Sequence, residues 1–162
     1  MIERVKEYFK QWNMEGNIRE FPVSSATVEL AAKALGCEPC RIAKTLSFRA
    51  GERVVLIVAA GDARIDNQKY KTAFGCKAKM LAPAEAEALT GHAVGGVCPF
   101  AVNAGAEVYL DESLRRFSTV FPACGSSNSA IELTCAQLEQ FASNFCGWAD
   151  VCKLPAPGAE QL

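Results

Sequence analysis

Lys44 lies in a segment where a lysine is unexpected. Residues 41–48 alternate like a half-buried β-strand, and Lys44 shares the face of Ile42, Leu46 and Phe48 because successive strand side chains point to opposite sides. An ammonium group is rarely buried without a partner, so this position suggests that a positive charge is needed there. Two structural explanations stay open: the lysine reaches water from near a strand end, or it pairs with a buried carboxylate.

Two glycine-bearing segments are candidates to join this lysine in a site. The first, residues 91–99, contains the adjacent glycines Gly95 and Gly96 and ends at Pro99. Adjacent glycines let the backbone approach a ligand closely and present its amide and carbonyl groups. The second, residues 124–129, is small and polar and lies between two predicted strands. Each segment alone is weak evidence, since glycine pairs mostly mark plain turns.

Composition indicates an ordinary globular protein. The chain has 162 residues, of which 50% are hydrophobic and 22% charged, a profile that suits one domain with a core of its own. Its longest apolar run, residues 54–60, has the length of a strand and is too short to span a membrane. The N-terminal residues lack the apolar stretch of a secretion signal. We therefore expect a cytoplasmic protein without membrane association.

The cysteines raise the question of metal or redox chemistry. There are eight, and without an export signal free thiols are expected. Cys37 and Cys40 form a CxxC pattern, which occurs in zinc and redox sites. No second CxxC follows and His92 is the only histidine, so we expect no metal and no cofactor. Packing of small side chains at a helix-ending turn is the favoured interpretation, and a thiol-based function is the alternative.

Charge is distributed unevenly along the chain. Residues 41–79 contain nine lysines and arginines against three acids, whereas the part from Phe117 onward has four acids and one lysine. A basic middle could form a face that binds nucleic-acid phosphates. The alternative is a solvated surface on which the charges are spread.

These candidate residues need elements to position them. Periodicity and caps predict helices over 2–14, over 27–35 with Ser24 or Ser25 as cap, from Asp66 to Phe74, from Pro83 to Gly91, and from Thr134 to about Phe145. Alternation and turn residues predict strands over 18–23, 41–48, 53–60, 77–81, 107–110, 118–122 and 130–133. Strands and helices mix irregularly, which predicts a single α+β domain built on one curved, barrel-like mixed sheet flanked by helices. We expect this domain to cover residues 1–154, followed by a flexible tail over 155–162.

Taken together, the lysine strand and the glycine segments resemble a known family. The segments that resemble the family are Ser24 to Thr27, Ala31 to Gly36, Ile42 to Phe48, Val94 to Phe100, and Gly125 to Leu133. This order and spacing is similar to the YbaK family, also called the prolyl-tRNA-synthetase-associated or tRNA-editing domain. The resemblance runs from about Phe21 to Leu138, and the lysine with the Gly-Gly-x-x-Pro loop is its most specific part.

The resemblance implies an aminoacyl-tRNA deacylase that acts in trans. The expected substrate is the acceptor end of a mischarged tRNA, notably tRNA for proline carrying a small residue such as cysteine, alanine, serine or threonine. Whether an aminoacyl-tRNA synthetase is a second partner is left open by the resemblance. By this resemblance the catalytic residues are Lys44 and Gly95, and the substrate-binding residues are Thr45, Gly96, Pro99, Cys124, Gly125 and Asn128. The alternative is a non-catalytic module of the same fold that binds aminoacyl-tRNA or a nucleotide.

Departures from the family pattern bear on the amino acid that is removed. Near Cys124, branches of the family carry a serine or histidine that touches the substrate, and in this chain that polar contact is missing or replaced by a thiol. Asn128 resembles an asparagine of the alanine-editing branch, but the His-Pro that precedes it there is absent. Cys98 stands where serine is common, and we expect it to be a packed small residue. We expect His92 at the surface, because no partner for acid–base catalysis can be named for it.

Overall fold

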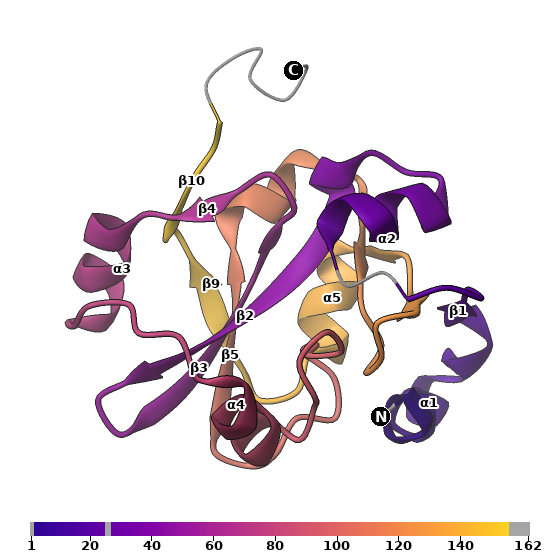
Figure 1. The fold of residues 1–162 in the computed structure, drawn as a ribbon, viewed down its shortest axis with the longest axis horizontal. Coiled ribbons are helices and arrows are strands. Elements are labelled where there is room, and N and C mark those ends of the chain that lie inside the picture. The colour runs from indigo at the N-terminus through magenta and orange to yellow at the C-terminus, as the bar shows by residue number, and fades with distance from the viewer. Residues whose placement is uncertain (1, 25–26, 156–162) are drawn as a thin grey trace.

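The computed structural model describes residues 2–24 and 27–155, which form a curled mixed sheet flanked by helices (Figure 1). The strands of the main sheet are β2 (Ile42–Ala50), β3 (Arg53–Ala60), β5 (Ala106–Asp111), β6 (Thr119–Pro122), β8 (Leu133–Thr134) and β9 (Phe145–Ala149). Their order is β8-β6-β2-β3-β5-β9. The central strands β2 and β3 are antiparallel, β6 is parallel to β2, and β5 is parallel to β3. The predicted α+β domain with a curved mixed sheet is confirmed.

Two short sheets tie distant parts of the chain together. They are made by β1 (Arg19–Glu20) with β7 (Ser129–Ala130), and by β4 (Arg64–Ile65) with β10 (Cys152–Lys153). The first joins the N-terminal part to the second glycine segment, and the second closes the region that follows β3.

Within residues 2–24 and 27–155, five α-helices flank the sheet, and their ends follow ordinary capping chemistry. They are α1 (Ile2–Phe9), α2 (Val28–Leu35), α3 (Asn67–Phe74), α4 (Pro83–Thr90) and α5 (Cys135–Phe141). Thr27 caps α2 by accepting from the amide of Leu30, which satisfies one of the donors left free at a helix start. The predicted cap Ser24 is therefore wrong, and the other candidate, Ser25, lies outside the described residues. No helix in the described part of the chain is long and apolar enough to cross a membrane.

The strand β3 is the centre of the core. Residues 55–60 have no exposed surface, because β3 has neighbours on both sides and its two faces are covered, a situation that favours a continuous run of apolar residues. The adjacent strand β2 is held in register by β3, with Lys44 opposite Ala59. The most deeply buried strand therefore sets the position of the lysine.

Several predicted elements are shorter than expected. The first helix ends at Phe9 and continues only as a 3₁₀ turn that closes at Asn13, whose φ is +58°. The predicted strand over 18–23 is reduced to the two residues of β1. Residues 77–81 do not form a strand, since only Met80 makes a bridge to Phe48.

Two predictions in the C-terminal third are wrong. The residues predicted as one strand over 130–133 divide between β7 and β8, which pair with different strands. The last helix ends at Phe141 instead of near Phe145, and the chain then enters the edge strand β9, parallel to β5. Of the predicted tail over 155–162, all but Pro155 lies outside the described residues.

Candidate active site

A cavity of about 370 Å³ opens beside the first half of β2. Its walls come from α2, β2, the start of α4, the first glycine segment and the second glycine segment. The described residues that line it are Thr27, Val28, Ala31, Leu35, Ile42, Ala43, Lys44, Thr45, Leu46, Ser47, Met80, Leu81, Pro83, Ala86, Val94, Gly95, Val97, Phe121, Ala123, Ser126, Ser127, Ser129 and Ala130. The volume falls at the lower end of the range for small-molecule sites.

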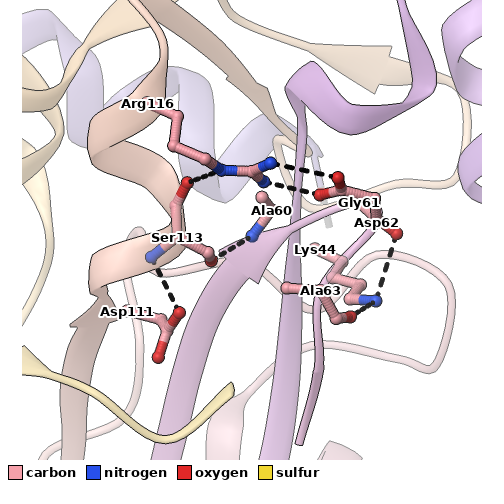
Figure 2. A network of polar contacts seen from close by, with 8 residues as sticks. All are labelled: Lys44, Ala60, Gly61, Asp62, Ala63, Asp111, Ser113 and Arg116. Carbon is pink, nitrogen blue, oxygen red and sulfur yellow. Dashed lines mark hydrogen bonds and ion pairs between the residues drawn. The ribbon is translucent and has the colours of Figure 1, made fainter. Parts of the chain in front are cut away.

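Lys44 is half-buried in the cavity wall and is held by backbone acceptors. Its Nζ donates to the carbonyl of Gly61, at 3.2 Å, and to the carbonyl of Ala63 (Figure 2). An ammonium group has three N–H donors, so this arrangement leaves one donor for an acceptor in the cavity. Of the two explanations left open by the sequence, pairing with a buried carboxylate is not observed, because the acceptors of the lysine are neutral carbonyls.

The electrostatics of Lys44 follow from this environment. Burial is the main influence and lowers the pKa of Lys44, whereas the nearby Cys152 and Asp62 act in the opposite direction. Carbonyl acceptors stabilise the ammonium without cancelling its charge, since they are neutral dipoles. The positive charge therefore stays available to an anionic or polarised group that enters the cavity.

The two glycine segments meet at the cavity. A Cβ on Gly96 would lie 2.7 Å from the carbonyl carbon and oxygen of Gly125 and 2.9 Å from the nitrogen of Ser126, so only glycine permits this backbone-to-backbone packing. Gly95 is exposed at the cavity, has a φ of +93°, and lies next to Ser127. The sequence predicted these segments separately, and the fold places them against each other.

Comparison with known proteins decides the family. Residues 23–141 match the aminoacyl-tRNA editing domain. The uncharacterized protein YwhH of Bacillus subtilis (strain 168) is 57% identical over 153 residues, which cover 94% of this chain and 97% of that protein. The chain belongs to the aminoacyl-tRNA editing domain family. The resemblance to the YbaK family inferred from the sequence is thereby confirmed.

Solved structures share the architecture of this editing domain. A crystallised protein named as a candidate trans-editing enzyme for prolyl tRNA synthetase has a TM-score of 0.84 and 29% identity, covering 94% of this chain and 96% of that one. The hypothetical protein APE2540 has a TM-score of 0.81 and 27% identity, covering 93% of this chain and 99% of that one. The similarity extends over nearly the whole length of both chains.

The polar wall of the editing domain's cavity is made of hydroxyl groups, of which the sequence analysis named only Thr45 individually. Ser126 and Ser129 are linked through their Oγ atoms at 2.6 Å, and the Ser127 Oγ lies 2.8 Å from the Oγ of Ser24. The Thr45 Oγ1 is buried and has no hydrogen-bond partner among the described residues. A buried hydroxyl without a partner is costly, so Thr45 keeps its place as a predicted substrate contact.

The other predicted contacts support the cavity of the editing domain from outside its lining. Cys124 has no exposed surface, and burial raises the pKa of its thiol well above the ordinary value. Pro99 is buried and accepts from the amide of Ser143 at 2.7 Å. Asn128 forms two hydrogen bonds with Phe21: its side-chain amide donates to the carbonyl of Phe21, and its backbone carbonyl accepts from the amide of Phe21. In this structure these three residues shape the glycine segments and do not touch the cavity.

His92 is a correction to the sequence analysis. It is completely buried, where the sequence analysis places it at the surface, and its Nε2 lies 2.7 Å from the carbonyl of Phe100. With Nε2 as the donor, Nδ1 is left without a partner among the described residues. The ring thus joins the two ends of the first glycine segment of the editing domain. Cys98 is packed beside it, with Sγ 3.6 Å from Nε2, in the place expected for a small buried residue.

We expect His92 to make the editing domain less stable in acid. Burial lowers the pKa of His92, whereas the unfolded chain takes up a proton near the ordinary value of about 6.5. Because the unfolded state then binds more protons, the free energy of unfolding decreases as the pH falls through 6.5 toward the lowered folded value. Thermal unfolding between pH 7.5 and 5 should show a smaller loss of Tm for His92→Gln, whose amide can still donate to Phe100. Equal losses in the two proteins would contradict this role.

The CxxC cysteines do not take part in the cavity of the editing domain. Cys37 and Cys40 are free and partly buried, and burial raises the pKa of both thiols. A raised pKa works against a reactive thiolate. Cys37 directly follows Gly36, which ends α2 with a φ of +70°, in agreement with packing at a helix-ending turn.

Proposed function

We propose that this editing domain hydrolyses the ester bond of mischarged aminoacyl-tRNA in trans, removing a small non-cognate amino acid from the tRNA for proline. The observation that carries the proposal is the cavity itself, which Lys44 and Gly95 both line. Among the described lining residues Lys44 is the only one with a charge, and none is a histidine, cysteine or carboxylate. Such a site suits attack by a positioned water better than attack by a side-chain nucleophile.

In the proposed reaction, water adds to the carbonyl carbon of the ester. The negative charge that develops on the carbonyl oxygen is stabilised by the free donor of Lys44. The bond between that carbon and the ribose oxygen then breaks, and the proton lost by the water reaches the ribose oxygen with help from the adjacent ribose hydroxyl. The products are a free amino acid and an uncharged tRNA. The exposed backbone groups of Gly95 orient the water or the amino group, since the Gly96 amide is already donated to Ala93.

The size and polarity of the cavity support a small amino acid as the residue that is removed from the tRNA. Its walls are largely apolar, with a band of hydroxyl groups from Thr45, Ser126, Ser127 and Ser129. A volume of about 370 Å³ that must also admit part of the terminal ribose leaves little room for a bulky side chain. The structural neighbour named for prolyl tRNA synthetase supports tRNA for proline as the carrier and that synthetase as a second partner. Charged tRNA also implies a cytoplasmic site of action.

The basic surface available to bind tRNA phosphates is smaller than the charge distribution along the sequence suggested. Arg41, Arg49, Arg53 and Lys69 all form ion pairs with acids, so the basic middle is not one free face. Lys71 and Lys77 are exposed, have no ion pair within the described residues, and line a shallow groove beside α3. The chain continues through the exposed Lys79 to Met80 at the cavity. We assign the acceptor-stem phosphates to this track of lysines.

Replacing both Lys71 and Lys77 by Gln should weaken tRNA binding to a similar extent for every tRNA, because phosphate contacts carry no sequence information. The slope of log affinity against log salt should become less steep by about two. Binding measured at several salt concentrations gives this slope. The matched control is Lys6→Gln with Lys10→Gln, a pair on the N-terminal segment whose lysines are bound to Glu20 and Glu7. An unchanged slope in the Lys71 and Lys77 variant would contradict the assignment.

A panel of charged tRNAs tests the proposed function. The tRNA for proline would be charged separately with Cys, Ala, Ser, Thr and Pro, and the release of each amino acid measured with and without the protein. We expect rapid release of one or a few of the small non-cognate residues and slow release of proline. The absence of accelerated release from every member would overturn the proposal.

A further inference from the structure

The turn that follows β3 supplies both acceptors of Lys44, and its middle residue points the other way. Gly61 and Ala63 give their carbonyls to the lysine, whereas the carboxylate of Asp62 between them faces Arg116 (Figure 2). Two guanidinium nitrogens of Arg116 donate to the two oxygens of Asp62 at 2.6 and 3.1 Å. The side chain of Asp62 is only 11% exposed, so this two-point ion pair is better shielded from water than an ordinary surface pair.

Arg116 is itself held in place by a chain of hydrogen bonds. Its Nε donates to the carbonyl of Ser113, and the Oγ of Ser113 accepts from the amide of Ala60 at 3.1 Å, directly before the turn. Asp111 accepts from the amide of Ser113 through one oxygen and from the amide of Val151 through the other. The 3₁₀ helix that carries Ser113 and Arg116, η4 (Glu112–Arg116), therefore binds the turn region at Ala60 and at Asp62.

Close packing at Gly61 also restrains the turn. A Cβ placed on Gly61 would lie 2.1 Å from the carbonyl oxygen of Pro39 and 2.8 Å from a methyl group of Val28. The turn is thus pressed between this region and the 3₁₀ helix, and its carbonyls cannot shift without breaking contacts on one side. Displacement of the carbonyls that bind Lys44 would therefore disturb close packing.

The charge of Arg116 has a second consequence for the lysine. Asp62 is in the same turn that binds the ammonium, and an unpaired carboxylate there would compete with the neutral carbonyls for Lys44. A lysine paired with that carboxylate would lose most of its ability to stabilise negative charge on a substrate. By binding both oxygens of Asp62, Arg116 keeps the carboxylate turned away and the lysine directed at the cavity.

We propose that Arg116 and Asp62 are positioning residues for Lys44, which lock the Gly61–Ala63 turn so that its carbonyls hold the ammonium toward the cavity with its charge free. This inference deepens the proposed function and rests on it. Neither side chain lines the cavity, so both act through the turn and not on the substrate.

Kinetics give the first test. Arg116→Ala and Asp62→Ala should each lower kcat for deacylation about ten- to a hundredfold with little change in KM, because a small displacement of the catalytic group is costly. The double variant should be no worse than the poorer single variant, since both changes remove one interaction. Arg116→Lys should recover part of the rate. Full activity in both single variants would overturn the proposal.

The matched control removes a similar ion pair elsewhere in the sheet. Arg53 binds both oxygens of Glu107, at 2.9 and 2.7 Å, and neither residue lines the cavity. Arg53→Ala should therefore leave kcat unchanged while removing an equally bidentate pair. If Arg53→Ala lowers kcat as much as Arg116→Ala does, general loss of stability explains the effect and the positioning role is wrong.

Titration of Lys44 by NMR tests the same inference without any substrate. The charged and titratable groups near its ammonium are Cys152, Asp62, Arg64 and Glu29. Arg116→Ala leaves the charge of Asp62 unbalanced and should raise the pKa of Lys44, whereas Asp62→Ala should lower it. Titration unchanged from wild type in both variants would contradict the proposal. If the wild type released no amino acid, the proposed function would fail, while opposite shifts in this titration would still support the coupling of the pair to Lys44.

Discussion

Replacement of Lys44 by methionine is expected to abolish most of the deacylation activity while leaving the fold intact. Methionine preserves the length and much of the volume of the side chain, so the packing around β2 is kept. The loss falls on stabilisation of the developing oxyanion, for which one donor typically contributes about 10²–10³-fold in rate. We expect a decrease of that size in kcat for release of the amino acid, measured under saturating charged tRNA.

The control for this variant is Lys10→Met. It removes an exposed lysine that directly follows α1 and is paired with Glu7. It should deacylate at the wild-type rate. Far-UV circular dichroism and thermal unfolding should show both variants folded, with Lys44→Met within about 1–3 kcal/mol of the wild type, because the carbonyls of Gly61 and Ala63 can bind water from the cavity instead. Wild-type turnover in Lys44→Met would refute the mechanism.

Replacement of Gly96 by alanine should lower both the stability and the activity of the protein. The new Cβ would lie 2.7 Å from the backbone of Gly125, and two backbones cannot yield as a flexible side chain would. The glycine segments must therefore separate, which we expect to cost about 1–3 kcal/mol of stability as in other overpacked sites. Displacement of the neighbouring Gly95 should lower the deacylation rate by at least about tenfold.

Gly16→Ala is the matched control for this substitution. A Cβ on Gly16 meets nothing within 4 Å, and its φ is not in the left-handed region. Its Tm and deacylation rate should therefore stay close to those of the wild type. Equal Tm and equal activity in Gly96→Ala and wild type would show that the contact between the two glycine segments is not needed.

The position of Lys44 could be predicted from sequence, whereas its partners could not. The two-residue period over 41–48 is strong, so the strand and the face of the lysine follow from local pattern. Its acceptors are the carbonyls of Gly61 and Ala63, and backbone acceptors leave no signature in the residue types. The Arg116–Asp62 pair was missed for a related reason, since it joins residues 54 positions apart whose ordinary surface types give no sign of burial.

The second glycine segment shows a similar limit within one loop. The sequence indicated that this polar segment contributes to the site, but it could not indicate which side chains face the cavity. In the fold, Ser126, Ser127 and Ser129 line the cavity while Cys124 enters the core, and pairing of β7 with β1 fixes the orientation of Ser129. A register that depends on a distant strand cannot be read from a short segment.

The strand β9 had no local signal at all. Residues 145–149 contain Gly147 and lack an alternating pattern, and the preceding capping box favours a longer helix. Asn144 ends that possibility, because its φ is +50° and its side chain donates to the carbonyls of Asn103 and Ala106. The strand then forms because β5 offers a free edge, which is a tertiary cause.

The measurement that tests the central claim most directly is turnover of mischarged tRNA for proline by a small amount of wild-type protein. With charged tRNA in at least tenfold molar excess, the account predicts release of many equivalents of a small non-cognate amino acid per protein molecule. A binding module of the same fold would release none and would protect one equivalent of the ester from spontaneous hydrolysis. Protection without turnover, on every small residue tested, would contradict the account.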